Sequence, residues 1–195
     1  MRHDWVLWIL LSASAIHVVE ERGLGWQGWA ARTLAPRIGI APSWLDFWAT
    51  NGLLIVFGVS ASAVGWRAPA FALAFPALCL VNAIFFHLLP SIRERRPNPG
   101  LFTALSLYLP IGIWAYVAAG DDGVLSAPTV IGSVVLGVAA MASVIVLLVL
   151  QPRFRYPDID TSVARRWGVE PGADRSSSAE TVGATLTADR VADPR

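Results

Sequence analysis

The stretch His17-Val18-Val19-Glu20-Glu21 places three ionisable side chains near the end of an apolar segment, residues 5–19. A charged group at the centre of a lipid bilayer costs about 2.5 kcal/mol or more. On a helix, His17, Glu20 and Glu21 have i, i+3 and i+4 spacing, so their side chains share one face. We therefore interpret this stretch as a metal-binding or acid/base cluster, and we expect polar residues of other membrane segments to be its partners.

The composition is that of an integral membrane protein. Of the 195 residues, 55% are hydrophobic, which exceeds the roughly 45–50% apolar content of soluble domains, and the mean hydropathy is +0.55. The formal net charge of +1 argues against a nucleic-acid partner. Cys79 is the single cysteine, so the chain forms no internal disulfide and no metal site of the multi-cysteine kind.

Apolar stretches long enough to cross a bilayer, for which about 20 residues are needed, recur along the chain. We predict an all-α polytopic membrane bundle within residues 1–150, with five transmembrane helices at about 5–22, 43–66, 70–90, 101–119 and 127–150. For the first stretch a signal peptide is the alternative, with Arg2 as its basic end and residues 12–15 as a small-residue cleavage site. The spans that follow favour a transmembrane helix.

The segment between the first two spans, residues 23–41, is less hydrophobic. Trp26, Trp29, Thr33 and Arg37 fall at helical spacing in it. Tryptophan is enriched at the level of the lipid headgroups, so we predict one helix that lies in the membrane interface. An ordinary loop with scattered tryptophans is the alternative.

The arginines predict the orientation of the chain in the cell membrane. With five spans, one side holds Arg2 and Arg67, whereas the other holds Arg22, Arg32, Arg37, Arg93, Arg95, Arg96, Arg153 and Arg155. By the positive-inside rule, the N-terminus is outside and the C-terminus is cytoplasmic. Residues 151–195 are rich in charged and small residues, and we predict a cytoplasmic tail that is largely disordered.

Polar residues of four spans gather in the cytoplasmic half of the predicted bundle. They are His17, Glu20, Glu21, Asp46, Asn51, Asn82, His87 and Thr103. At about 1.5 Å per residue, His17 lies roughly 7 Å inside Arg22, and His87 lies roughly 9 Å inside Arg93. The matching depths predict one shared site. Ser43-x-x-Asp46 has the spacing of a capping box, so we assign Asp46 to the start of a helix.

The sequence His17-x-x-Glu20-Glu21 at the end of a first membrane helix resembles the motif of the HXXEE domain family of small bacterial membrane proteins. Asn82-x-x-x-x-His87 and Pro99-Gly100-x-x-Thr103-Ala104 are also similar to that family, and the resemblance covers about residues 5–120. It implies a shared site at His17, Glu20, Glu21, Asn82 and His87, with or without a metal ion. It implies no substrate.

The residue types favour a membrane enzyme that depends on a metal ion. Two imidazoles with one or two carboxylates are a common ligand set for Zn or non-haem Fe. We predict His17, Glu20 and His87 as the metal ligands, although Glu21 has equally good spacing. The remaining glutamate would be a general base, and Asn82 would orient the substrate, so Glu20, Glu21 and Asn82 are the candidate catalytic residues. The substrate would be a lipid or another apolar molecule, because the site opens within the membrane.

Three other interpretations stay open. A His–Glu pair in an apolar cavity can move a proton without a metal, as in isomerases that act on sterols, which is an analogy only. A non-enzymatic transporter or membrane partner protein also uses buried Glu and His, but polar residues are scarce in the outer halves of spans one and three. Finally, each polar residue can be a structural contact between helices. His3 is assigned no role.

Overall fold

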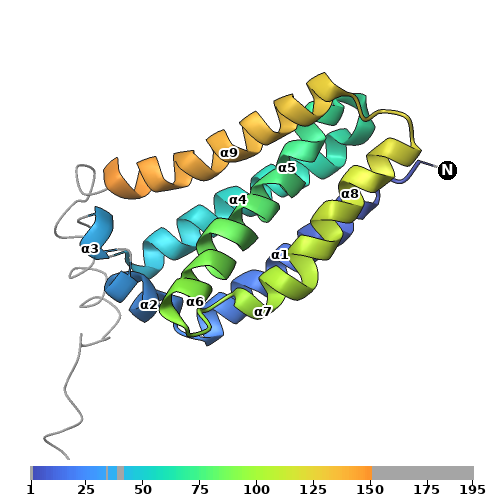
Figure 1. The fold of residues 1–195 in the computed structure, drawn as a ribbon. Helices are drawn as coiled ribbons and strands as arrows, with labels where there is room; N and C mark the ends of the chain where they lie inside the picture. Colours follow the sequence, from blue (N-terminus) through green and yellow to red (C-terminus); the bar gives the residue numbers. More distant parts are fainter. Residues whose placement is uncertain (1, 34, 39–41, 151–195) are drawn as a thin grey trace, which may run out of the picture. The chain divides into compact units, whose positions relative to one another are not determined.

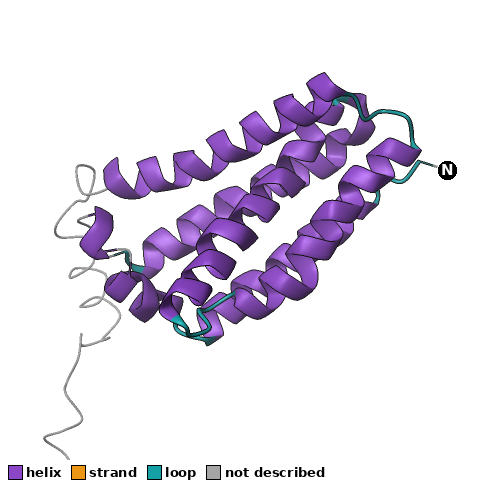
Figure 2. Ribbon diagram, viewed as in Figure 1, coloured by secondary structure: helices purple, strands orange, loops and turns teal. Residues whose placement is uncertain are grey.

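Helices form all the regular structure in the described part of the chain (Figures 1 and 2). The computed structural model describes residues 2–33, 35–38 and 42–150. The predicted all-α membrane bundle is therefore confirmed. The predicted tail, residues 151–195, lies outside the described residues.

Five helical segments run the length of the bundle, and three of them change helix type on the way. They are α1 (Val6–Gly23); α4 (Trp44–Val64) with the 3₁₀ turn Gly65–Arg67; α5 (Pro69–Val81) with the π-helix Asn82–Leu88 and α6 (Leu89–Glu94); α7 (Leu101–Thr103) with the π-helix Ala104–Tyr108 and α8 (Leu109–Asp121); and α9 (Ala127–Leu150). The short helices α2 (Trp26–Thr33) and α3 (Ala35–Ile38) connect α1 to α4.

Four of these segments are long and apolar enough to cross a membrane: Trp44–Arg67, Pro69–Glu94, Leu101–Asp121 and Ala127–Leu150. The protein is thus a multi-pass membrane protein. Helix α1 has 18 residues and ends with Glu20, Glu21 and Arg22 in its last turns. These three charged residues distinguish α1 from the four candidate spans, but α1 packs against α4 and α8 as part of the same bundle. The fifth predicted crossing is α1, so the count of five crossings stays a prediction, as does the orientation of the chain.

The segment predicted to lie in the interface forms α2 and α3. Gly25 precedes α2 with a φ of 77°, a left-handed conformation that favours glycine. Trp29 is only 8% exposed, and the Trp26 ring lies 5.1 Å from that of Phe47 in α4. Helix α2 therefore packs its tryptophans against the bundle. The capping box that begins α4 is confirmed, because the Ser43 hydroxyl accepts from the Asp46 N–H and the Asp46 carboxylate accepts from the Ser43 N–H.

Helix α5 is the centre of the bundle and contacts α1, α4, α8 and α9. Its closest neighbour is α9, which lies along it in Figure 1. At Gly137 of α9, a Cβ atom would come within 2.7 Å of the Ala77 Cβ and 2.8 Å of the Ala74 carbonyl oxygen. Only glycine allows the two backbones to approach this closely, as small residues do between membrane helices.

At the end of the bundle near the N-terminus, a carboxylate joins three separate segments. Asp122 accepts hydrogen bonds from the His3 backbone N–H at 2.6 Å, from the His3 Nδ1 at 2.7 Å and from the Trp66 Nε1 at 2.7 Å. Arg2 and Asp4 form an ion pair at 3.4 Å beside it. His3, which was assigned no role from the sequence, thus fastens the N-terminal segment to the turn between α8 and α9.

Candidate functional site

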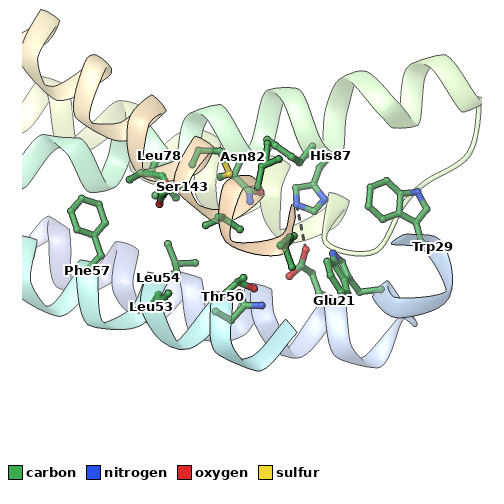
Figure 3. A pocket seen from close by; sticks show the side chains of 18 residues that line it. Glu21, Trp29, Thr50, Leu53, Leu54, Phe57, Leu78, Asn82, His87 and Ser143 are labelled. Carbon is green, nitrogen blue, oxygen red and sulfur yellow. Dashed lines mark hydrogen bonds and ion pairs between the residues drawn. The ribbon is translucent and has the colours of Figure 1, made fainter. Parts of the chain in front are cut away.

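His17, Glu21 and His87 form a buried group at the other end of the bundle. His17 and Glu21 lie one turn apart on α1, and His87 comes from the π-helix that follows α5. The His17 Nε2 is 3.7 Å from the Glu21 Oε1, and the His87 Nε2 is 3.6 Å from the same oxygen (Figure 3). The three residues are between 1% and 6% exposed. Side chains 70 positions apart thus converge on one carboxylate, as the matching depths predicted.

The π-helix Asn82–Leu88 explains how Asn82 and His87 reach the same face. In an α-helix, residues five apart point in directions about 140° apart. A π-helix has i→i+5 hydrogen bonds, so residues five apart lie nearly above one another. Both side chains accordingly line the same cavity. The sequence showed the spacing of this pair, but an expectation of regular α-helix did not place both residues on one side.

Asn98 fixes the orientation of the His87 ring. The Asn98 Nδ2 donates to the Phe86 carbonyl at 2.8 Å, and its Oδ1 lies 3.2 Å from the His87 Nδ1. Pro90 has no N–H to offer the Phe86 carbonyl, four residues earlier, and Asn98 supplies a donor in place of that α-helical bond. Since the Asn98 Oδ1 is an acceptor, the His87 Nδ1 carries the proton and the Nε2 holds a lone pair.

Thr103 and Glu20 fix the His17 ring in the same way. The Thr103 hydroxyl donates to the Glu20 carboxylate at 2.5 Å and lies 2.7 Å from the His17 Nδ1. A hydroxyl has one proton, and here it goes to the carboxylate, so the His17 Nδ1 must be the donor to Thr103. The Glu20 carboxylate also accepts the backbone N–H groups of Phe102 and Thr103, which begin the fourth span.

Both histidines consequently present a lone pair on Nε2 towards Glu21. Neither Nε2 has a hydrogen-bond partner within the described residues. Separations of 3.6 and 3.7 Å from the Glu21 Oε1 are too long for hydrogen bonds. A buried polar atom without a partner is costly. Two such nitrogen atoms that face one carboxylate indicate a binding site for a further atom or ion between them.

Gly100 lies against this group. A Cβ atom on Gly100 would come within 2.5 Å of the His87 Cε1, 2.8 Å of the His17 Cε1 and 3.0 Å of the Glu21 Cγ. Its φ is 91°, which also favours glycine. The Pro99-Gly100 pair therefore brings the loop close to both imidazoles, and no residue with a side chain fits there without displacing them.

A cavity of about 360 Å³ extends from Glu21 and His87 between α4, α5 and α9 (Figure 3). Asn82 and Asn51, both noted in the sequence, line this cavity. The Asn51 Nδ2 donates to the Phe47 carbonyl at 2.9 Å. The Asn82 Oδ1 is buried and has no hydrogen-bond partner within the described residues, so Asn82 has an acceptor available beside the cavity.

The structure therefore divides the predicted site residues into two sets. His17, Glu21 and His87 face one another, whereas the Glu20 carboxylate is occupied by Thr103 and by the start of the fourth span. Asn98, Gly100 and Tyr108, to which no role was assigned from the sequence, also lie at this group, and the Tyr108 ring is 4.4 Å from that of His17. The Asn98-Pro99-Gly100 turn signal points to a loop, but it does not reveal which helices that loop touches.

The donor set fits a divalent metal ion. The ligand atoms of His17, Glu21 and His87 all lie within 4.8 Å of one another. With Zn–N and Zn–O bonds of about 2.0–2.2 Å, two ligands of a tetrahedral site are roughly 3.4 Å apart. The two separations from the Glu21 Oε1, 3.6 and 3.7 Å, are close to this value. Hydrogen bonds on the remote nitrogen of each imidazole are also typical of metal-bound histidines.

The fold and this group define a helical membrane protein with a buried His/Glu site. The family described as "Protein of unknown function with HXXEE motif" matches residues 8–115, which is more than half of the chain, and the protein belongs to this family. The match includes His17, Glu21 and His87, whereas α9 lies beyond it. Neither a curated protein nor a solved structure matches the chain.

Proposed function

We propose that the protein is a membrane enzyme that holds Zn or Fe between His17, Glu21 and His87 and acts on a lipid or another apolar substrate. The observation that carries this proposal is the pair of imidazole Nε2 atoms, which have no hydrogen-bond partner in the described part of the chain and both face the Glu21 carboxylate. Two histidines and one carboxylate are the ligand set of many catalytic Zn and non-haem Fe sites, which keep a position open for substrate or water.

Glu21 replaces Glu20 as the ligand in this proposal. The Glu20 carboxylate already accepts three hydrogen bonds, from the Phe102 N–H, the Thr103 N–H and the Thr103 hydroxyl. We assign Glu20 to positioning, because through Thr103 it holds the His17 ring. The two adjacent glutamates of the motif thus have different tasks, although their helical spacing from His17 is equally favourable.

An ion bound at this group would act as a Lewis acid on a substrate oxygen. The protein itself would hold the ion, keep bulk water away and orient the substrate from the cavity side. Asn82 is suited to the last of these tasks, because its amide borders the cavity beside His87. We also propose the orientation given by the arginines, with the site in the cytoplasmic half of the membrane.

The test is the metal content of the protein purified in detergent. We expect about one Zn or Fe per chain in the parent protein, and a loss of affinity of about a hundredfold or more in His87→Ala and in Glu21→Gln, since each removes one of a few ligands. His3→Ala, which alters the histidine at the opposite end of the bundle, is the matched control and should keep the metal.

A folded parent protein that takes up no metal when Zn or Fe is supplied would contradict the proposal. The metal-free interpretation would then gain support, in which Glu21 and the two imidazoles exchange protons with an apolar substrate. Uptake that is equal in the parent protein, His87→Ala and Glu21→Gln would place the metal elsewhere.

A further inference from the structure

The cavity beside the candidate metal group has a polar end and an apolar end. Glu21 and His87 lie towards one end, with Thr50 of α4 beside them and Trp29 further out (Figure 3), and Asn51 of α4 also lines the cavity. Further along, its walls are formed by apolar side chains, among them Leu54, Phe57, Leu78 and Met141. From Thr50 to Phe57 the α4 wall rises by about 10 Å. A molecule that matches this lining has a polar group at one end and an apolar body.

The cavity is open towards the side of the bundle. Leu53 of α4 and Ile145 of α9 both line it, and they are 53% and 37% exposed. Helix α9 packs on α5, and α4 packs on α1 and α5, so α4 and α9 face each other across the cavity. In a membrane this side faces lipid, because α4 and α9 both have the length and composition of membrane spans. A ligand can therefore enter from the bilayer.

The size of the cavity suits a ligand with one chain. About 360 Å³ is the volume of about twelve groups the size of a water molecule, at about 30 Å³ each. One chain of about that many heavy atoms fills this volume, whereas the two long chains of a phospholipid do not both fit inside it. The volume also lies at the lower end of the range for small-molecule sites.

Buried polar atoms that lack a hydrogen-bond partner among the residues that the structure describes lie at the polar end. The His87 Nε2 and the Asn82 Oδ1 are buried, belong to residues that line the cavity, and have no hydrogen-bond partner within the described residues. Both atoms are acceptors, so a ligand hydroxyl, of an alcohol or of a protonated acid, can donate a hydrogen bond to one of them. An apolar molecule alone leaves them unsatisfied.

We propose that this cavity binds a single-chain amphiphile that enters between α4 and α9 and places its oxygen-bearing end at His87 and Asn82. The inference rests on the proposed function for the reaction at that end, but the binding itself requires no metal. It names the substrate class as an acid or alcohol with one chain.

Photolabelling in nanodiscs of phosphatidylcholine tests this proposal. One probe is a fatty acid that carries a diazirine near its methyl end. Its length of about twelve carbons is chosen to match the cavity volume. The other is a phosphatidylcholine with the same diazirine chain. We expect the fatty acid to label residues around Leu78 and Met141, and unlabelled fatty acid to compete for these positions. The phospholipid probe should label only outward-facing residues.

The matched variants are Ala140→Phe, in the wall of the cavity, and Ala139→Phe, its exposed neighbour on the same helix. We expect Ala140→Phe to lower the cavity labelling by about tenfold, because the added ring fills the space, and Ala139→Phe to leave it unchanged. Since Ala140 also packs against the core, Ser143→Phe is the second variant. Ser143 lines the cavity, but its side chain is exposed, so the core is undisturbed.

Equal labelling of Leu78 and Met141 by both probes would overturn the proposal, as would labelling that Ala140→Phe and Ser143→Phe leave unchanged. These results are separable from the metal measurement. Selective labelling of a protein that takes up no metal would support the proposed amphiphile site and contradict the proposed metal-dependent function. A protein that binds metal but shows no selective labelling would support the metal centre and contradict the amphiphile site.

Discussion

The two ends of the bundle each hold a carboxylate beside histidine, yet they are built differently. The side chains of Asp122 and Glu21 are similarly buried, at 9% and 8% exposed. Asp122 has donors at 2.6–2.7 Å from His3 and Trp66. Glu21 instead has two imidazole nitrogens at 3.6–3.7 Å, neither of which is hydrogen-bonded within the described residues.

This difference separates a structural contact from a candidate site. At Asp122, direct hydrogen bonds satisfy the carboxylate and join the N-terminus to the rest of the bundle. At Glu21, the hydrogen bonds are made to the remote nitrogens of the histidines, through Thr103 and Asn98. The near nitrogens are therefore held in place and left available, which is the arrangement expected of metal ligands.

The largest effect that distinguishes the two ends is expected from their glycines. Gly100 and Gly65 both have a positive φ, of 91° and 53°. An alanine costs about 1–3 kcal/mol of stability at each from backbone strain alone. At Gly65 the Cβ meets the Asp4 carboxylate, which can rotate away, whereas at Gly100 it meets the two buried imidazoles. We expect Gly100→Ala to abolish metal binding and Gly65→Ala to leave it within about twofold.

Thermal unfolding and metal titration in detergent measure both glycine variants. Metal binding by Gly100→Ala that equals that of the parent protein would contradict the proposed difference between the two ends, since the loop would then not confine the imidazoles. Loss of the metal by Gly65→Ala while it remains folded would also contradict this difference.

A smaller effect is expected from the residues that hold the histidine rings. Thr103→Val and Asn98→Ala each remove the partner of one Nδ1, and we expect metal affinity to fall by about 10–100-fold. At the opposite end, Trp66→Phe removes a hydrogen bond to Asp122 and should not change metal affinity. Titration with Zn in competition with a chelator gives the three affinities. Equal affinities for all three proteins would mean that Thr103 and Asn98 are structural only.

The smallest effect concerns pH at the Asp122 end. The His3 backbone N–H, followed by the His3 and Trp66 side chains, holds the pKa of Asp122 below its ordinary value of 3.8, against the opposing effect of desolvation. A lowered pKa in the folded state means stability that is present above 3.8 and is lost as the pH falls through the lower folded-state value.

Asp122→Asn should therefore lower the unfolding temperature at neutral pH, and the difference from the parent protein should shrink as the pH falls below 3.8. Asp121→Asn, at the exposed neighbouring position, is the control and should differ little from the parent protein across this pH range. A difference for Asp122→Asn that does not change with pH would show that the charge of Asp122 contributes nothing.

Much of the fold follows from the sequence, because segment length and hydropathy determine where a helix can cross a bilayer. The capping box at Ser43 and Asp46 also follows, since its contacts are local. The π-helix at Asn82–Leu88 does not follow, because the hydrophobic pattern of a membrane helix carries no clear period. Pro90 is its nearest sequence signal, since it removes a backbone donor just beyond that turn.

The candidate site was predictable as a region but not as an arrangement. Matching depths bring His17 and His87 together, yet i+3 and i+4 spacing does not decide between Glu20 and Glu21. That choice depends on where the fourth span begins, because its N–H groups and Thr103 engage Glu20. Asn98 and Gly100 reach the site through a loop whose path depends on the packed helices, which local sequence does not specify.

X-ray absorption at the metal edge tests the central claim most directly. The protein loaded with Zn in detergent is compared with His87→Ala and with His3→Ala. We predict a shell with two imidazoles and one carboxylate at about 2.0–2.2 Å, with one imidazole fewer in His87→Ala and no change in His3→Ala. A shell without imidazole, or one that His87→Ala leaves unchanged, would contradict the assignment of His17, Glu21 and His87 as a metal centre.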